Sequence, residues 1–143
     1  MDFLDGLGGT FIISPDPASL AAWYSRCFGF KFEQFGSSHH QTFWTLDPAE
    51  PSRRVDTHFA IMAAKVPVPS FEQKEEPSDM YGDQPFMLNL RIRDMDGLLT
   101  HLEQLEVPII KKEDESYGRF AWVRDPDGHR IELYQPLSPP PTK

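Results

Sequence analysis

The sequence predicts an α+β fold in which two βαβββ modules, each a strand, a helix and three further strands, follow one another along the chain. Three observations support this prediction. Each half contains one stretch with apolar residues at helical spacing, each such stretch begins just after an aspartate, and the flanking segments show the apolar grouping or alternation of strands. A repeat of about half the chain indicates duplicated modules rather than a solenoid.

The first module is expected over residues 8–64. Its first strand is Thr10–Ile13, and its helix begins after Asp16, a good N-cap, with Pro17 at the first helical position. An apolar stripe follows at helical spacing, and Gly29 ends the helix. The three remaining strands of this module are predicted at Phe30–Phe35, Gln41–Leu46 and Thr57–Ala64.

The second module is expected over residues 86–136 and repeats the same order. Its first strand is Phe86–Ile92, and Asp94 takes the place that Asp16 has in the first module. Leu98 and Leu102 follow Asp94 by four and eight places, which is helical spacing. The remaining strands are predicted at Val107–Ile110, Gly118–Arg124 and His129–Gln135.

The segment between the modules, residues 65–85, is rich in proline and charge. It is expected to be an inter-module linker, with a covering segment over a site as the alternative, because structureless connections of this length are uncommon otherwise. Residues 137–143 are expected to be a disordered tail.

The composition limits the classes of partner. The chain has 143 residues and a net charge of −8, so it can bury the core of one domain and repels nucleic-acid backbones. No apolar run is long enough to cross a membrane. The single cysteine, Cys27, lies on the apolar stripe of the first helix, where we expect an inert core thiol. One cysteine also rules out an intrachain disulfide framework, and we expect a cytoplasmic protein.

Three stretches resemble the vicinal oxygen chelate superfamily, which groups glyoxalases, bleomycin-resistance proteins and dioxygenases. They are DPASLAAWYSRCFGF, NLRIRDMDGLLTHL and GRFAWVRDPDGHRIELYQP. The last is the most specific, because a strand, an Asp-Pro-x-Gly turn and an Ile-Glu-Leu strand occur in order. The resemblance implies cupped mixed sheets with helices on their outer faces and a cleft enclosed by the paired modules. Strand alternation then directs Arg130, Glu132 and Tyr134 towards the cleft, and Ile131 and Leu133 towards the helices.

The same resemblance supplies a test for a metal site. Metal-dependent members place ligands on the first, fourth, fifth and eighth strands, and the corresponding positions here are Gly9, Ala60, Met87 and Glu132. Only Glu132 carries a suitable donor, and about three protein ligands are the usual minimum for a catalytic ion. We therefore expect no cofactor, with a divalent ion (Zn, Ni, Fe or Mn) in a rearranged site as the alternative.

Candidate site residues come from the predicted cleft faces and, for Arg119, from the expected rim of the cleft. Glu132 is the candidate catalytic group, either as a base or as a carboxylate for a cationic or hydroxylated ligand, and a plain ion pair with Arg91, Arg124 or Arg130 is the structural alternative. His39 and His40 are expected in an exposed hairpin loop. The candidate ligand-binding residues are Trp44, His58, Asn89, Arg91, Arg119, Phe120, Trp122, Arg124 and Tyr134.

Together these features predict a protein that binds a small organic molecule in an aromatic- and arginine-lined cleft without the usual metal site. We expect a homodimer with no nucleic-acid or membrane partner. The alternatives are a metal-dependent lyase or dioxygenase that resembles glyoxalases, and a structural or regulatory dimer with no pocket.

Overall fold

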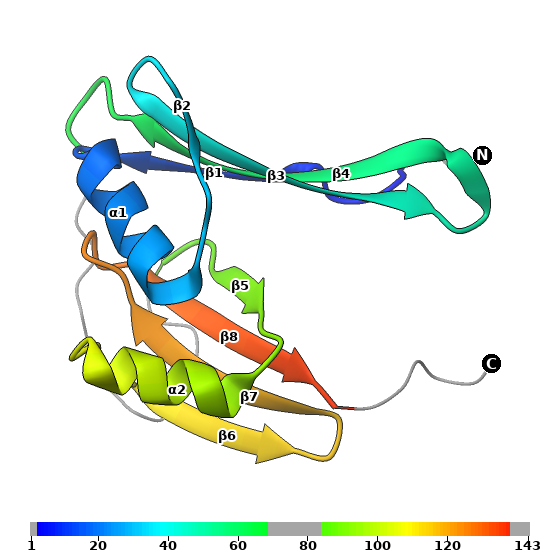
Figure 1. Cartoon of the computed structure of the whole chain (residues 1–143). Coiled ribbons are helices and arrows are strands. Elements are labelled where there is room, and N and C mark those ends of the chain that lie inside the picture. The colour runs from blue at the N-terminus through cyan, green and yellow to red at the C-terminus, as the bar shows by residue number, and fades with distance from the viewer. Residues whose placement is uncertain (1–2, 69–83, 138–143) are drawn as a thin grey trace. The chain divides into compact units, whose positions relative to one another are not determined.

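The computed structural model describes residues 3–68 and 84–137 (Figure 1). The chain divides into two compact units, Met1–Val68 and Pro69–Lys143. Most of the expected linker, and the expected tail apart from Leu137, lie outside the described residues.

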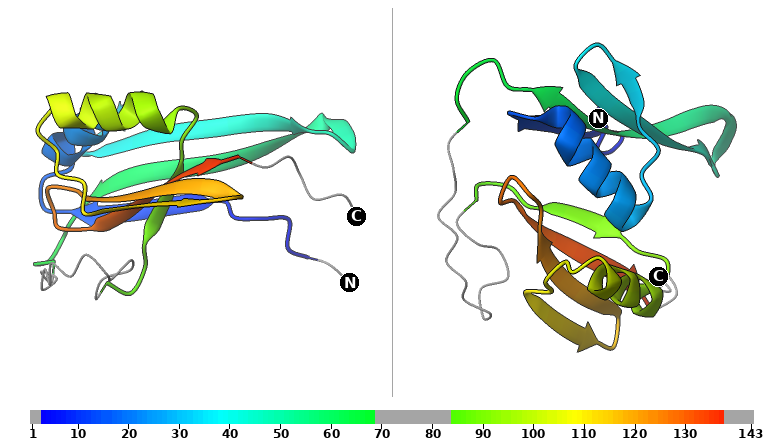
Figure 2. Two further views of the ribbon diagram at one scale, coloured as in Figure 1. Left: turned by 90° about the horizontal axis from the view of Figure 1, so that it is seen from below. Right: turned by 60° about the vertical axis from the view of Figure 1, so that its left-hand side comes forward.

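The first unit contains one helix and one mixed sheet. The strands lie in the order β1-β4-β3-β2, with β1 parallel to β4 and the other neighbours antiparallel. Helix α1 packs against this sheet (Figure 2). The elements are β1 (Gly9–Ser14), α1 (Pro17–Phe28), β2 (Glu33–Phe35), β3 (Ser38–Asp47) and β4 (Glu50–Ala63).

Helix α1 is bounded as its sequence predicts. The Asp16 carboxylate accepts a hydrogen bond from the Ser19 N–H over 3.1 Å, which satisfies one free N–H of the first turn. Gly29 ends the helix in the left-handed conformation, with φ of 82°. The buried stripe packs on the sheet, where the ring of Tyr24 lies 5.3 Å from that of Phe59. This contact sets which face of the first sheet is core.

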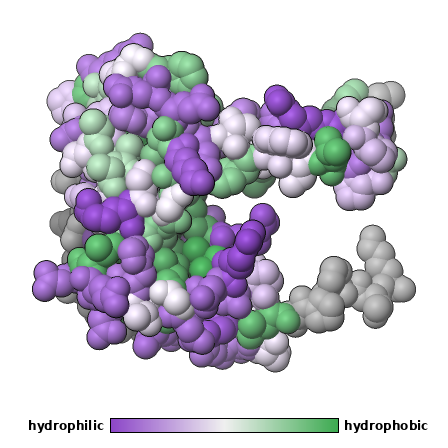
Figure 3. Space-filling model, in the orientation of Figure 1, coloured by the Kyte–Doolittle hydropathy of each residue, from purple (hydrophilic) through white to green (hydrophobic). Residues whose placement is uncertain are grey.

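Strands β3 and β4 form a long hairpin that projects beyond the rest of the first unit (Figure 3). The turn before β3 is at Gly36, whose φ is 59°, so the chain has already entered β3 at Ser38. The prediction of a loop at His39 and His40 was wrong for this reason. Because side chains alternate along a strand, the rings of His39 and His40 point to opposite faces of the first sheet. The centroid of the His39 ring lies 6.4 Å from that of Phe32.

The second unit repeats this plan. Its strands lie in the order β5-β8-β7-β6, with β5 parallel to β8, and α2 covers one face of the sheet (Figures 1 and 2). The predicted α+β fold of two βαβββ modules is confirmed. The elements are β5 (Leu88–Arg91), α2 (Met95–Gln104), β6 (Lys111–Glu115), β7 (Gly118–Arg124) and β8 (Arg130–Pro136).

The predicted strand Val107–Ile110 was wrong, because the strand lies just after it at Lys111–Glu115. Val107 instead closes the end of α2, where its N–H donates to the Leu102 carbonyl over 2.9 Å. Within the described residues strand β6 pairs only with β7, and an edge strand can be as polar as KKEDE since charge there discourages pairing with other chains. The apolar pattern therefore pointed to the wrong segment.

The second sheet is held to α2 by fully buried side chains on β7 and β8. Ala121, Val123, Ile131 and Leu133 all have 0% exposure, and the side chain of Gln135 on the same face accepts a hydrogen bond from the Met95 N–H over 2.7 Å. Because side chains alternate along a strand, Glu132 and Tyr134 must point to the opposite face. This opposite face, which α2 does not cover, is called the Glu132 face below.

Gln84 extends the pairing of β5 with β8. Its side-chain amide donates to the Arg130 carbonyl and accepts from the Arg130 N–H, both over 2.7 Å. The Gln84 side chain thus supplies Arg130 with the donor and the acceptor that the main chain of a neighbouring strand would otherwise provide.

Candidate functional site

Six side chains on the Glu132 face form two rows across β7, β8 and β5. The register sets Trp122 opposite Glu132, and Glu132 opposite Asn89. Two residues further along β8, Phe120 stands opposite Tyr134, and Tyr134 opposite Arg91. The structure therefore brings together six of the predicted site residues: Asn89, Arg91, Phe120, Trp122, Glu132 and Tyr134.

The partner of Glu132 is an amide. Asn89 Nδ2 donates to Glu132 Oε2 over 2.5 Å, and within the described part of the chain Glu132 forms no ion pair. The expected pairing with Arg91, Arg124 or Arg130 is corrected accordingly. An amide neutralises no charge, so the carboxylate is oriented by Asn89 and keeps one oxygen for another donor.

Aromatic rings flank the carboxylate on β7 and β8. The rings of Phe120 and Tyr134 are nearly parallel, with centroids 5.1 Å apart, and Phe120 is similarly aligned with Trp122 at 6.1 Å. Trp122 is 1% exposed, and among the described residues its Nε1 has no hydrogen-bond partner. A buried donor without an acceptor is costly, so this indole N–H is a destabilising feature of the Glu132 face.

Arg124 and Arg130 begin the next row of this face, opposite each other on β7 and β8. Arg130 is buried at 2% exposure, and its main chain is held by Gln84. Arg124 is half-buried and lies one row from Trp122, on the side away from Phe120. Both arginines thus border the six-residue cluster rather than the aromatic pair.

Arg119 is separated from the cluster. Its guanidinium donates to Asp96 of α2 over 2.8 Å and to Asp114 of β6 over 3.2 Å, which places it on the helix side of the sheet. The hydrogen bond to Asp96 is the largest cause that raises the pKa of Arg119 above its ordinary value. The structure therefore does not place Arg119 beside Glu132.

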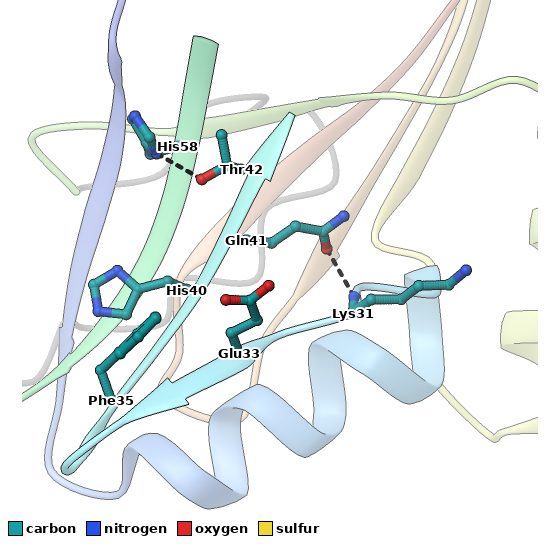
Figure 4. Close-up of a pocket in the computed structure, with 7 residues that line it drawn as sticks. All are labelled: Lys31, Glu33, Phe35, His40, Gln41, Thr42 and His58. Carbon is teal, nitrogen blue, oxygen red and sulfur yellow. Dashed lines mark hydrogen bonds between the residues drawn. The ribbon is translucent and has the colours of Figure 1, made fainter. Parts of the chain in front are cut away.

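The first unit has a hollow of about 580 Å³ on the sheet face that carries His58 (Figure 4). His58 Nδ1 and Thr42 Oγ1 are 2.9 Å apart across β3 and β4, and the Lys31 N–H donates to Gln41 Oε1 over 2.7 Å. Trp44, 59% exposed, lies two residues beyond Thr42 and outside the hollow. The lining residues are Lys31, Glu33, Phe35, His40, Gln41, Thr42 and His58.

Sequence reasoning found only His58 among these lining residues. Glu33 and His40 stand opposite each other on β2 and β3, and both strands begin or end elsewhere than predicted. Alternation along β3 is the signal that could have identified lining residues. Once β3 starts at Ser38, alternation places the side chains of His40 and Thr42 on the same face as His58.

The positions of the expected metal ligands do not suit a metal. The register shows that Ala60 is the equivalent of Glu132 in the first unit. Ala60 stands opposite Phe11, and Glu132 stands opposite Asn89. Phe11 and Asn89 each lie five residues before the aspartate that caps the helix of their unit. Ala60 offers no donor, and neither does Gly9. Within residues 3–68 and 84–137, no three His, Cys, Asp or Glu side chains group where they could hold a metal ion.

Gly9 also has no room for a side chain. A Cβ at this position would stand 2.7 Å from the main-chain nitrogen of His58 and closer still to its carbonyl oxygen. Its φ of 146° is in addition rarely adopted by other residues. The backbone of β1 therefore approaches β4 where a ligand-bearing residue would need space.

The turn before β8 is held by Asp125. This buried carboxylate accepts from the Asp127 N–H over 3.0 Å, from the His129 N–H over 2.9 Å and from His129 Nδ1 over 2.8 Å. The hydrogen bond to Asp125 raises the pKa of His129 above its ordinary value, although partial burial opposes the shift. His129 is thus a structural group of the turn that leads directly into β8, the strand that carries Arg130 and Glu132.

A family model covers these elements. The model described as Glyoxalase/Bleomycin resistance protein/Dioxygenase superfamily matches residues 6–133, from just before β1 to Leu133 within β8. The chain belongs to this superfamily. Solved structures share the fold at low sequence identity. A comparison with curated proteins found no match.

Three solved structures share this fold although their sequences differ widely from that of this chain. TioX from Micromonospora sp. ML1 has a TM-score of 0.60 at 18% identity, covering 93% of this chain and 100% of its own. Lactoylglutathione lyase from Agrobacterium tumefaciens has a TM-score of 0.58 at 16% identity, with 94% and 96% covered. Oxidase ChaP-H1 has a TM-score of 0.63 at 15% identity, with 94% and 98% covered. Such differently named proteins on one fold mean that function here must be argued from the site.

Neither helix in the described part of the chain is long and apolar enough to span a membrane.

Proposed function

We propose that this superfamily member binds a small organic molecule at the Glu132 face without a metal ion. The observation that carries the proposal is the hydrogen bond from Asn89 to Glu132, which orients the carboxylate beside the ring pair of Phe120 and Tyr134. An oriented carboxylate next to an aromatic wall suits a hydroxylated or cationic ligand.

The residues at the other three expected metal-ligand positions support a proposal without a metal ion. Gly9 and Ala60 have no donor atoms, and Met87 offers a thioether, which hard or borderline divalent ions bind poorly. No chemical step is therefore assigned to an ion, and Glu132 acts as a hydrogen-bond acceptor or a base from the protein alone.

Thermal shift on the purified chain, together with elemental analysis, tests the proposal. We expect less than stoichiometric Zn, Ni, Fe and Mn, a melting temperature insensitive to these ions, and stabilisation by some members of a set of hydroxylated and cationic aromatic compounds. Glu132→Gln should abolish that stabilisation, whereas Glu103→Gln, an exposed carboxylate change on α2, should leave it intact.

The contrary outcome is equally specific. One equivalent of a transition metal that co-purifies with the chain and is lost in Glu132→Ala would replace the proposal with a metal-dependent lyase or dioxygenase function. If no compound stabilises the chain, the proposal fails.

The proposal includes a cytoplasmic homodimer. Large apolar side chains remain exposed on the first unit, with Phe11 at 62% and Trp44 at 59%, and exposed apolar patches of this kind commonly mark interfaces. Light scattering at micromolar concentration should give twice the mass of 16.4 kDa. A monomeric mass over that range would remove the dimer from the proposal.

A further inference from the structure

The Glu132 face presents a positive and a negative group that are not paired with each other. Arg91 is exposed, and within the described residues it makes no ion pair or side-chain hydrogen bond, while Glu132 is held by Asn89. Both side chains leave the same face because Asn89 and Arg91 are two residues apart on β5. The cluster therefore carries an available guanidinium and an oriented carboxylate together.

The register fixes how these two groups are placed. Arg91 stands opposite Tyr134, one row beyond Glu132 and on the neighbouring strand. Strands about 4.8 Å apart and a two-residue advance of about 6.6 Å put the two attachment points roughly 8 Å apart on the diagonal. A single ring with substituents at opposite ends can bridge such a diagonal, and the Tyr134 and Phe120 rings border it.

We infer that the ligand of the Glu132 face is an aromatic acid that carries a hydroxyl or amino group at its far end. This inference rests on the proposed function and narrows it. The acid is held by the Arg91 guanidinium, which matches a carboxylate with two parallel N–H donors. The hydroxyl or amino group donates to the Glu132 oxygen that Asn89 leaves available, and the ring lies against Tyr134 and Phe120.

Arg91 is then the specificity-determining residue of the site, and Asn89 is a positioning residue that acts through Glu132. A ligand with the same ring but an uncharged amide in place of the acid keeps its contacts with Glu132 and the rings. It loses the charge-assisted pair with Arg91, so it should bind about tenfold more weakly.

The test uses 4-hydroxybenzoate and 4-hydroxybenzamide as probes, titrated into the full isotope-labelled chain and followed by amide resonances of β5 and β8. We expect the acid to bind about tenfold more tightly than the amide. Arg91→Met should bring the two affinities within about twofold of each other. Lys112→Met removes the same charge from the helix side of the same sheet, where Lys112 stands opposite Ala121, and should preserve the preference.

Each other outcome overturns the inference. If the acid and the amide bind these strands with equal affinity, small-molecule binding is supported but Arg91 does not determine ligand specificity. Loss of the preference in Lys112→Met to the same extent would show a general charge effect. If neither probe moves these resonances while compounds from the thermal-shift set do, the ligand class is wrong and the proposed function stands. If nothing binds, both fail.

Discussion

Gly9 and His58 stand opposite each other on the parallel strands β1 and β4, so close that a Cβ on Gly9 would overlap the His58 main chain. In this superfamily member the first strand therefore excludes a side chain at the place where metal-dependent members would carry a ligand. The contact also accounts for the glycine at this position without any appeal to flexibility.

Gly9→Ala should lower the free energy of unfolding by about 1–3 kcal/mol, because the added Cβ meets backbone and the φ of 146° is strained for alanine. Gly8→Ala is the matched control, since nothing lies within 4 Å of its Cβ, and it should change stability little. Chemical denaturation measures both. Equal effects of the two substitutions would contradict the close approach.

Substitutions at the ends of the two helices should change the free energy of unfolding in opposite directions. Gly29 after α1 and Glu106 after α2 both adopt left-handed backbone, with φ of 82° and 59°. Gly29→Ala should cost about 1 kcal/mol, whereas Glu106→Gly should stabilise by up to about 1 kcal/mol, because only glycine adopts this conformation without strain. Urea unfolding of both variants checks the pair, and a loss of stability in Glu106→Gly would refute it.

His129 should make stability depend on pH. The Asp125 hydrogen bond raises its folded-state pKa, so its stabilising contribution is full below the unfolded pKa and is lost as pH rises through the folded value. His129→Gln should therefore lower the free energy of unfolding by about 1 kcal/mol more at pH 6 than at pH 9. A difference between variant and wild type that is the same at both pH values would exclude this contribution.

Cys27 should be chemically inert in the folded chain. Burial raises the pKa of its thiol to about 11, with Arg26 opposing the shift, and its side chain is 1% exposed. At pH 8 only about one thiol in a thousand would be ionised. Ellman's reagent should react at least about a hundredfold faster in denaturant than in buffer. Rapid reaction of the native chain, absent from Cys27→Ala, would contradict this expectation.

Local signals predicted the parts of the fold that local chemistry determines. Asp16 and Asp94 cap their helices as expected, and alternation assigned Ile131 and Leu133 to the core and Glu132 to the opposite face. Strand β6 escaped because an edge strand needs no apolar residues. In that segment the sequence pattern and the pairing disagree.

The neighbours of Glu132 required more than alternation. Alternation identifies a face, but it does not say which residues of two strands stand side by side, because a slip of two residues keeps every side chain on its face. The arginines were therefore as plausible as Asn89 until the register was known. The roles of Trp44, His58, Arg91 and the other ligand-binding candidates remain predictions for the experiments above.

The amide of Gln84 has a consequence for this register. Since it takes both the N–H and the carbonyl of Arg130, sliding β5 by two residues along β8 would break two hydrogen bonds while leaving the faces unchanged. Together with the ladder of β5 and β8, Gln84 thus favours the register in which Asn89, rather than Met87 or Arg91, is the neighbour of Glu132. A glutamine outside the six-residue cluster therefore helps to determine which amide the Glu132 carboxylate contacts.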